Sequence, residues 1–359
     1  MTYVVTVATV GAITAIFCLG VNVSWGWVGQ IDLAYYAYVA VGAYGAMILE
    51  LPPPSHKIAT TFRSYILGLH WPFIPSVLAA TAMGGVAALL VGLFAMRRLR
   101  GEYIAIITAC TALMFAAVTT QSTQLLGGYI GIYGLTLPLN TTLHLGAVGY
   151  SYFYLGLCVF CLALVYVVLE RLYKSPFGRS LRAVRENEMA AAAFGRNLFW
   201  LRLRSYALGG AVAAFGGALY ANYLLAWNPA SWNLIEVTLL ISGVVVGGRA
   251  NSRGVIIGSV IIDSLLPEIS RLFPLLTSTT TLGPTVASII GAGGIIVMLR
   301  FRPGGILREP RTRDRSPTRA VATEGGAAVP AVAQAGAGGS ATGSAMSGTT
   351  TTMEGSSGD

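Results

Sequence analysis

Residues Arg171 to Arg204 read RLYKSPFGRSLRAVRENEMAAAAFGRNLFWLRLR and decide the fold, because they form one polar stretch in an otherwise apolar chain. Eight of the 23 Lys and Arg residues fall in it. The segments on both sides are long and apolar enough to cross a lipid bilayer. Loops rich in Lys and Arg between membrane spans stay in the cytoplasm. The stretch therefore predicts an integral membrane protein with a cytoplasmic loop at residues 171–204.

A helix is expected inside this loop. Ser175, Pro176 and Gly178 are turn residues, whereas Ser180 to Phe194 contains no helix breaker. Gly195 is a typical stop just beyond the C-terminus of a helix. The pattern predicts a single helix over residues 180–194.

Charges of opposite sign are spaced to meet on one side of that helix. Arg182 and Glu186 stand at i,i+4, and Arg185 and Glu188 stand at i,i+3. Ala190 to Ala193 add small side chains that another surface could approach closely. Two interpretations follow: a docking helix for a soluble partner, or a solvated connector whose charge only fixes the membrane topology.

The composition excludes an ordinary soluble domain. Of 359 residues, 55% are hydrophobic and only 10% are charged, and the mean hydropathy is +0.68. Soluble domains carry about 25% charged residues. The net charge of +9 does not indicate nucleic-acid binding, because the basic residues alternate with apolar spans and form no single face.

We expect an all-α, polytopic membrane protein with about nine transmembrane helices, in a range of about 8 to 10. The first segment has no signal-peptide pattern and is interpreted as a spanning helix. The candidate spans are Tyr3 to Val21, Ile31 to Leu49, Ser76 to Met96, Tyr103 to Thr120, Tyr150 to Leu169, Ser205 to Ala226, Leu234 to Gly248, Gly254 to Leu272 and Pro284 to Leu299.

The charge distribution supports one orientation. With the 171–204 loop inside, the N-terminus lies outside and the C-terminus lies in the cytoplasm. Of the 23 Lys and Arg residues, only Lys57, Arg63 and Arg271 then lie outside, as expected when positive charge stays inside. The predicted domains are a transmembrane domain at 1–308 and a disordered cytoplasmic tail at 309–359, rich in Gly, Ala, Ser and Thr.

Two segments break the simple spanning pattern. Asn22 to Gln30 (NVSWGWVGQ) is polar and glycine-rich, and Leu234 to Gly248 has only 15 residues, about 22 Å of helix. Interrupted helices are tolerated where backbone is buried in protein or lines a cavity, so both segments are candidates for a transport path. The alternative is a short linker and a thinly spanning helix.

The sequence contains no recognisable set of catalytic residues. The three histidines lie in separate segments, and Cys158 and Cys161 lie in an apolar span with no other metal-ligand residue beside them, so neither a metal site nor a cofactor is predicted. No P-loop is present, because neither Lys57 nor Lys174 follows the required glycines. Any ATP dependence must therefore come from another polypeptide.

Ionisable groups at membrane depth by default suggest function, and Asp32, Glu236 and Asp263 are the candidates. They keep open an alternative class, a secondary transporter driven by an ion gradient. Thr108 and Thr111 place hydroxyls along the fourth span, which suits either a polar lining or bonding between helices.

The central loop resembles that of the branched-chain amino acid ABC transporter permeases. Residues 177–195 match F-G-R-x-L-R-A-[IV]-R-E-x-E-x-A-A-x-x-x-G. Four further stretches are similar to family motifs in the same order: Gly29 to Leu33, Leu99 to Ile106, Leu126 to Ile132 and Met298 to Leu307. The resemblance covers residues 1 to about 308. Asp32, Ala34, Arg249, Ala250 and Arg253 depart from the family pattern.

The resemblance implies the permease subunit of an ABC importer in a bacterial-type cytoplasmic membrane. Its partners would be a homologous permease subunit, two ATP-binding subunits, an extracytoplasmic solute-binding protein and membrane lipid, with no nucleic acid. The implied substrate is a branched-chain or related amino acid, and urea and short amides are alternatives. The expected residues for coupling to the ATPase are Arg179, Arg182, Arg185, Glu186, Glu188 and Gly195. The candidate path residues are Asn22, Gln30, Asp32, Thr108, Thr111, Gly127, Gly128, Gly247 and Gly248.

Overall fold

The computed structural model describes residues 2–52, 68–98, 101–135, 137–139, 146–229, 234–265, 293, 300 and 305–307. The chain divides into two units, Met1–Arg311 and Thr312–Asp359, and the described residues belong to the first. The predicted span at Pro284 to Leu299 lies almost entirely outside the described residues, and the predicted tail at 309–359 does so completely.

Among the described residues, four helices are long and apolar enough to cross a membrane. They are α1 (Thr2–Val21), α3 (Phe73–Arg98), α4 (Gly101–Gln121) and α7 (Ala147–Lys174). At 1.5 Å per residue, 20 residues span about 30 Å, the thickness of the hydrocarbon layer. Most of α1 is buried within the bundle, whereas α3, α4 and α7 expose much of their apolar surface.

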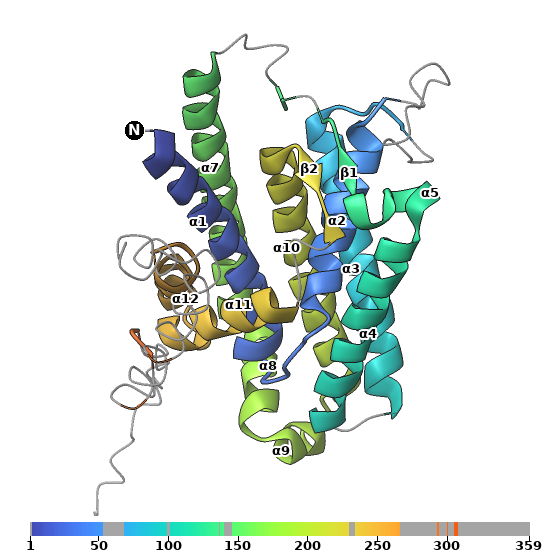
Figure 1. Cartoon of the computed structure of the whole chain (residues 1–359). Helices are drawn as coiled ribbons and strands as arrows, with labels where there is room; N and C mark the ends of the chain where they lie inside the picture. Colours follow the sequence, from blue (N-terminus) through green and yellow to red (C-terminus); the bar gives the residue numbers. More distant parts are fainter. Residues whose placement is uncertain are drawn as a thin grey trace, which may run out of the picture. The chain divides into compact units, whose positions relative to one another are not determined.

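Two further long helices complete the centre of the bundle: α2 (Tyr35–Glu50) and α10 (Leu198–Leu224). Helix α10 packs along α2 and α3 (Figure 1). The helices approach closely because small residues meet: a Cβ on Gly42 would lie 2.1 Å from the carbonyl oxygen of Ala214, and one on Gly217 would lie 2.1 Å from that of Val39. Small residues thus allow close packing between α10 and α2.

The remaining described elements are short. Strands β1 (Ile132–Tyr133) and β2 (Ala226–Trp227) form an antiparallel pair in which Ile132 lies opposite Trp227. The others are η1 (Asn22–Gly26), α5 (Thr123–Leu126), η3 (Gly128–Ile130), α8 (Pro176–Glu186), α9 (Glu188–Ala193), α11 (Leu234–Gly247), α12 (Ser252–Ser259) and η5 (Val260–Leu265).

The prediction of a single helix over residues 180–194 is wrong. Helix α8 already begins at Pro176, and the helix breaks at Asn187, which has extended backbone angles (φ −152°, ψ 103°). The Asn187 side-chain oxygen accepts a hydrogen bond from the Ala190 N–H at 3.0 Å. Asn competes well for such capping positions. It therefore ends α8 and starts α9, and the two helices form a hairpin.

Candidate functional site

The first membrane helix does not end cleanly. After Val21 it widens into the π-helical turn η1, and residues 27–34 are non-helical before α2 begins. Gly29 has φ +83°, a left-handed conformation that favours glycine. We call residues 27–34 the α1–α2 linker. The second predicted span consequently begins at Tyr35 rather than Ile31.

Side chains of neighbouring helices bind the backbone of η1 and the linker. The Ser205 hydroxyl donates to the carbonyl of Val23 at 2.8 Å, and the Tyr206 hydroxyl donates to that of Ile31 at 3.3 Å. Both donors lie in α10 and are buried. Backbone groups freed by the interruption thus find partners inside the protein, as irregular backbone at membrane depth requires.

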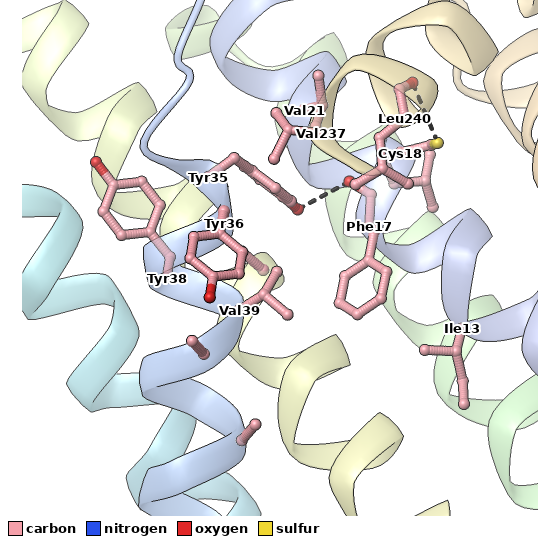
Figure 2. Close-up of a cluster of buried hydrophobic side chains, with 14 of the residues drawn as sticks. Ile13, Phe17, Cys18, Val21, Tyr35, Tyr36, Tyr38, Val39, Val237 and Leu240 are labelled. Carbon is pink, nitrogen blue, oxygen red and sulfur yellow. Dashed lines mark hydrogen bonds between the residues drawn. The ribbon is translucent and has the colours of Figure 1, made fainter. Parts of the chain in front are cut away.

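A cluster of buried side chains joins α1, α2 and α11 beside the interruption. The Tyr35 hydroxyl donates to the carbonyl of Phe17 at 2.8 Å, and the Cys18 thiol donates to the carbonyl of Leu240 at 3.5 Å (Figure 2). These contacts hold the first residue of α2 and the short helix α11 against the same stretch of α1.

The structure brings the irregular end of α1 next to the turn that follows the short, continuous helix α11. The side-chain oxygen of Asn22 accepts a hydrogen bond from the N–H of Ala250 at 2.9 Å. The Arg249 guanidinium lies 5.0 Å from the centre of the Trp25 ring. Gly247, the last residue of α11, packs against α12, where an added Cβ would lie 2.2 Å from the carbonyl oxygen of Gly254. Asn22, Gly247 and Gly248 therefore belong to one region.

Three more predicted path residues lie at or beside the linker. Gln30 is buried, and within the described part of the molecule neither polar atom of its side chain has a hydrogen-bond partner. Asp32 is also buried, and one carboxylate oxygen accepts from the Ala34 N–H at 3.0 Å. The Thr108 hydroxyl oxygen accepts from the Leu33 N–H at 3.2 Å.

The other predicted path residues lie elsewhere. Thr111 donates its hydroxyl to the carbonyl of Ile107 in its own helix at 2.8 Å. Gly127 and Gly128 form the turn between α5 and η3 with φ +73° and +58°. This turn follows the opposite end of α4 from Thr108 and lies beside β1 (Figure 1). The nine residues predicted to line the transport path thus do not form one cluster.

Several charged residues of the α8–α9 hairpin contact their own chain. The Arg182 guanidinium lies 4.6 Å from the centre of the Tyr173 ring. Arg185 donates to the carbonyl of Gly26, and Glu188 accepts from Arg202 in α10. The helical spacing expected for Arg185 and Glu188 does not hold, because the helix breaks between them.

The sequence argument missed the apolar surface of the hairpin. Met189 and Phe194 are 84% and 86% exposed, the highest values for large hydrophobic side chains in the described chain. Gly195, at φ +72°, has open space around it. A groove of about 530 Å³ lies between the helices, lined by Pro176, Arg179, Ser180, Ala183, Ala191, Phe194 and Arg196. The sequence did contain a signal for this surface, because Met189 and Phe194 are large apolar residues in a polar loop.

Comparison with known proteins identifies the family. A family model described as "Branched-chain amino acid transport system / permease component" matches residues 3–292. The chain belongs to this permease family. The resemblance found in the central loop is confirmed, and the permease is a multi-pass protein of the cytoplasmic membrane.

Individual relatives agree with this assignment. The permease is 29% identical over 330 residues to the high-affinity branched-chain amino acid transport system permease protein LivM of Escherichia coli, covering 86% of this chain and 70% of the relative. It is 27% identical over 244 residues to the probable branched-chain amino acid transport permease protein LivM of Methanocaldococcus jannaschii, covering 66% and 68%. The ribose import permease protein RbsC of Bacillus subtilis is 33% identical over 114 residues, covering 30% and 35%. No solved structure matches this permease.

In this permease, most of the residues singled out from the sequence fall into two structural groups, whereas Thr111, Gly127 and Gly128 lie elsewhere. One is the α8–α9 hairpin, with an exposed apolar surface. The other is the interrupted region around Asn22, Asp32 and Ala250, which is buried and polar. Among the described residues, no group of three His, Cys, Asp or Glu side chains is placed to hold a metal ion.

Proposed function

We propose that this chain is the membrane-spanning subunit of an ABC importer that moves branched-chain amino acids into the cell. The observation that carries the proposal is the α8–α9 hairpin, which exposes Met189 and Phe194 next to a groove. Membership of the permease family and the absence of a P-loop in the sequence support ATP hydrolysis by separate subunits.

The hairpin has the properties of a docking surface for the ATP-binding subunit. Met and aromatic side chains are enriched at protein interfaces and often supply most of the binding energy. The nearby charges of Arg179 and Glu186 suit the polar rim of such an interface. By contrast, Arg182, Arg185 and Glu188 contact their own chain and so fix the position of the hairpin.

The complete assembly would follow the importer plan. We propose about nine transmembrane helices, an external N-terminus, a permease domain at 1–308 and a cytoplasmic tail at 309–359, as the charge distribution suggests. The partners would be a homologous permease subunit, two ATP-binding subunits and an extracytoplasmic solute-binding protein. The pair of permeases would alternate between outward-open and inward-open states as the ATP-binding subunits close and separate.

The interrupted region is proposed as the inner part of the transport path. Its buried polar groups include the side chains of Gln30, Asp32 and Thr108, which are costly at membrane depth unless they serve a purpose. We place the Gly127–Gly128 turn at the outer end, because it follows the other end of α4. Thr111 then lies between the two ends.

Two alternative functions can be distinguished from this one by experiment. A urea or short-amide permease would share the architecture and differ in substrate. An ion-coupled secondary transporter is favoured by one observation, the burial of the Asp32 carboxylate, and Glu236 and Asp263 would complete its set of ionisable groups.

Reconstitution separates these functions. The permease is placed in liposomes alone, and then together with the homologous permease subunit, the ATP-binding subunits and the solute-binding protein of its source organism. Uptake of radiolabelled leucine is compared with uptake of urea and acetamide. ATP-dependent leucine uptake only by the complete assembly supports the proposal. Gradient-driven uptake by the permease alone would refute it, and ATP-dependent uptake of urea without uptake of leucine would show that the substrate is urea rather than a branched-chain amino acid.

A further inference from the structure

One side chain connects the cytoplasmic hairpin to the interrupted first helix. Arg185, in the last turn of α8, donates from Nη1 to the carbonyl oxygen of Gly26, the last residue of η1. The final carbonyls of a helix have no partner within it, and a cation there also interacts favourably with the helix dipole. A guanidinium on such a carbonyl makes a charge-assisted hydrogen bond. The contact thus joins two elements separated by 159 positions in sequence.

The Arg185 side chain also lies along the linker. A Cβ built on Gly29 would lie 3.2 Å from Cγ of Arg185, so the missing side chain at Gly29 leaves space for the stem of the arginine. The end of η1 and the following turn are therefore both in contact with this single residue.

A second contact reinforces the same connection. The ring of Trp27, the first linker residue, lies 5.4 Å from that of Tyr173, centre to centre. Arg182, one turn before Arg185 in α8, covers the same Tyr173 ring. Helix α8 therefore holds the interruption directly through Arg185 and indirectly through Tyr173. A movement of α8 cannot leave the interrupted helix unaffected.

The connection continues into the turn between α11 and α12. Asn22 begins η1 and accepts from the Ala250 N–H, and Trp25 contacts Arg249. Both contacts lie on the same five-residue turn that ends at Gly26. Helix α8 and the turn after α11 are thus linked through η1.

We infer that Arg185 is the positioning residue that transmits displacement of α8 to the interrupted end of α1, and that Asn22 passes it on to the turn after α11. The inference rests on the proposed function, because it needs an ATP-binding subunit that moves α8. It goes further in naming the contacts that carry the movement. The evidence is a continuous set of hydrogen bonds and ring contacts between rigid elements.

The test separates coupling from assembly. The chromosomal gene of the source organism is replaced by Arg185→Met, Arg185→Lys or Asn22→Ala. The ratio of leucine taken up to ATP hydrolysed is measured in proteoliposomes containing the purified complex. We expect Arg185→Met and Asn22→Ala to lower this ratio by about tenfold, the effect of one charge-assisted or buried hydrogen bond. Basal ATP hydrolysis and the yield of complex should fall less than this ratio does, since the contacts removed, Arg185 to Gly26 and Asn22 to Ala250, lie within this chain.

The conservative and control variants exclude a merely structural role. Arg185→Lys keeps one charged donor and should recover part of the coupling. Lys174→Met removes a cation near α8 whose partner is Glu170 on the same helix, and it should leave the ratio unchanged. Coupling within twofold of wild type in Arg185→Met or in Asn22→Ala would overturn the inference. Loss of the assembled complex in both variants would overturn it too, because it would assign both residues to folding. If wild-type uptake does not depend on ATP, the proposed function itself fails.

Discussion

The side-chain oxygen of Asn22 lies 2.9 Å from the backbone nitrogen of Ala250, 228 positions further along the chain, and accepts its hydrogen bond. Asn22 begins the interruption of the first membrane helix, and Ala250 lies in the turn between α11 and α12. Ala250 has φ +66°, so a left-handed turn presents its N–H to Asn22. This hydrogen bond satisfies one polar group of each stretch inside the protein, as irregular backbone in a membrane protein requires.

The exposed apolar residues of the hairpin give the first prediction. Phe194→Ala should reduce co-purification of the ATP-binding subunit with the permease by about tenfold, because a buried aromatic anchor contributes more than 1 kcal/mol to a typical interface. The permease itself should still be inserted in the membrane, since Phe194 is 86% exposed. Co-purification is measured by quantitative immunoblotting of the two subunits.

The matched control for this experiment is Phe160→Ala in α7. Phe160 is 67% exposed, but it lies within an apolar candidate span. It should leave co-purification unchanged. Equal loss in both variants would mean that the effect comes from destabilisation of the permease rather than from docking.

The contact between Glu188 and Arg202 gives a second prediction. It joins α9 to α10 through a charge-assisted hydrogen bond. Arg202→Glu should detach α9 and weaken binding of the ATP-binding subunit about threefold, because exposed ion pairs contribute about 1 kcal/mol or less. The double variant Glu188→Arg with Arg202→Glu should restore binding. Titration of the detergent-solubilised permease with the ATP-binding subunit measures both effects, and a double variant weaker than either single variant would contradict the prediction.

Close helix packing gives a third prediction. Gly42→Val should prevent correct folding, because the added side chain would meet the backbone of Ala214, where even a Cβ would lie 2.1 Å from the carbonyl oxygen. Overpacking of this kind costs at least about 1 to 3 kcal/mol, and a backbone neighbour leaves little room for adjustment. The amount of monodisperse permease in fluorescence size-exclusion chromatography reports the change. Gly156→Val in α7, where nothing lies within 4 Å, is the control and should keep near-normal yield.

The sequence predicted the long elements well, for a physical reason. An uninterrupted apolar run can only be a helix in lipid, so the spans at α1, α3, α4 and α7 follow from composition and length. The cytoplasmic hairpin was harder. Asn187 is compatible with a helix interior in sequence, and only its hydrogen bond to Ala190 shows that it acts as a cap.

The candidate site was predicted in part. Its two segments could be recognised from Asn22 to Gln30 and from the short span before Gly248, because polar and glycine residues in a membrane segment are unusual. The contact between these two regions could not be predicted from the sequence. It depends on the hydrogen bond between Asn22 and Ala250, which are 228 positions apart. Helical spacing likewise assigned Arg185 to a partner on its own helix, whereas it reaches the carbonyl of Gly26.

The orientation in the membrane gives the last prediction. In a Cys110→Ala background, which removes an exposed cysteine, Lys174→Cys should be protected from a membrane-impermeant maleimide in intact cells and should react after permeabilisation. The reason is that residues 171–204 hold eight basic residues, and such loops remain in the cytoplasm. Tyr129→Cys, at a side chain that is 69% exposed and follows the other end of α4, should react in intact cells. Gel shift of the labelled protein measures both. Reaction of Lys174→Cys from outside would place the hairpin where no ATP-binding subunit could reach it, so the docking surface and the role of Arg185 would both be rejected.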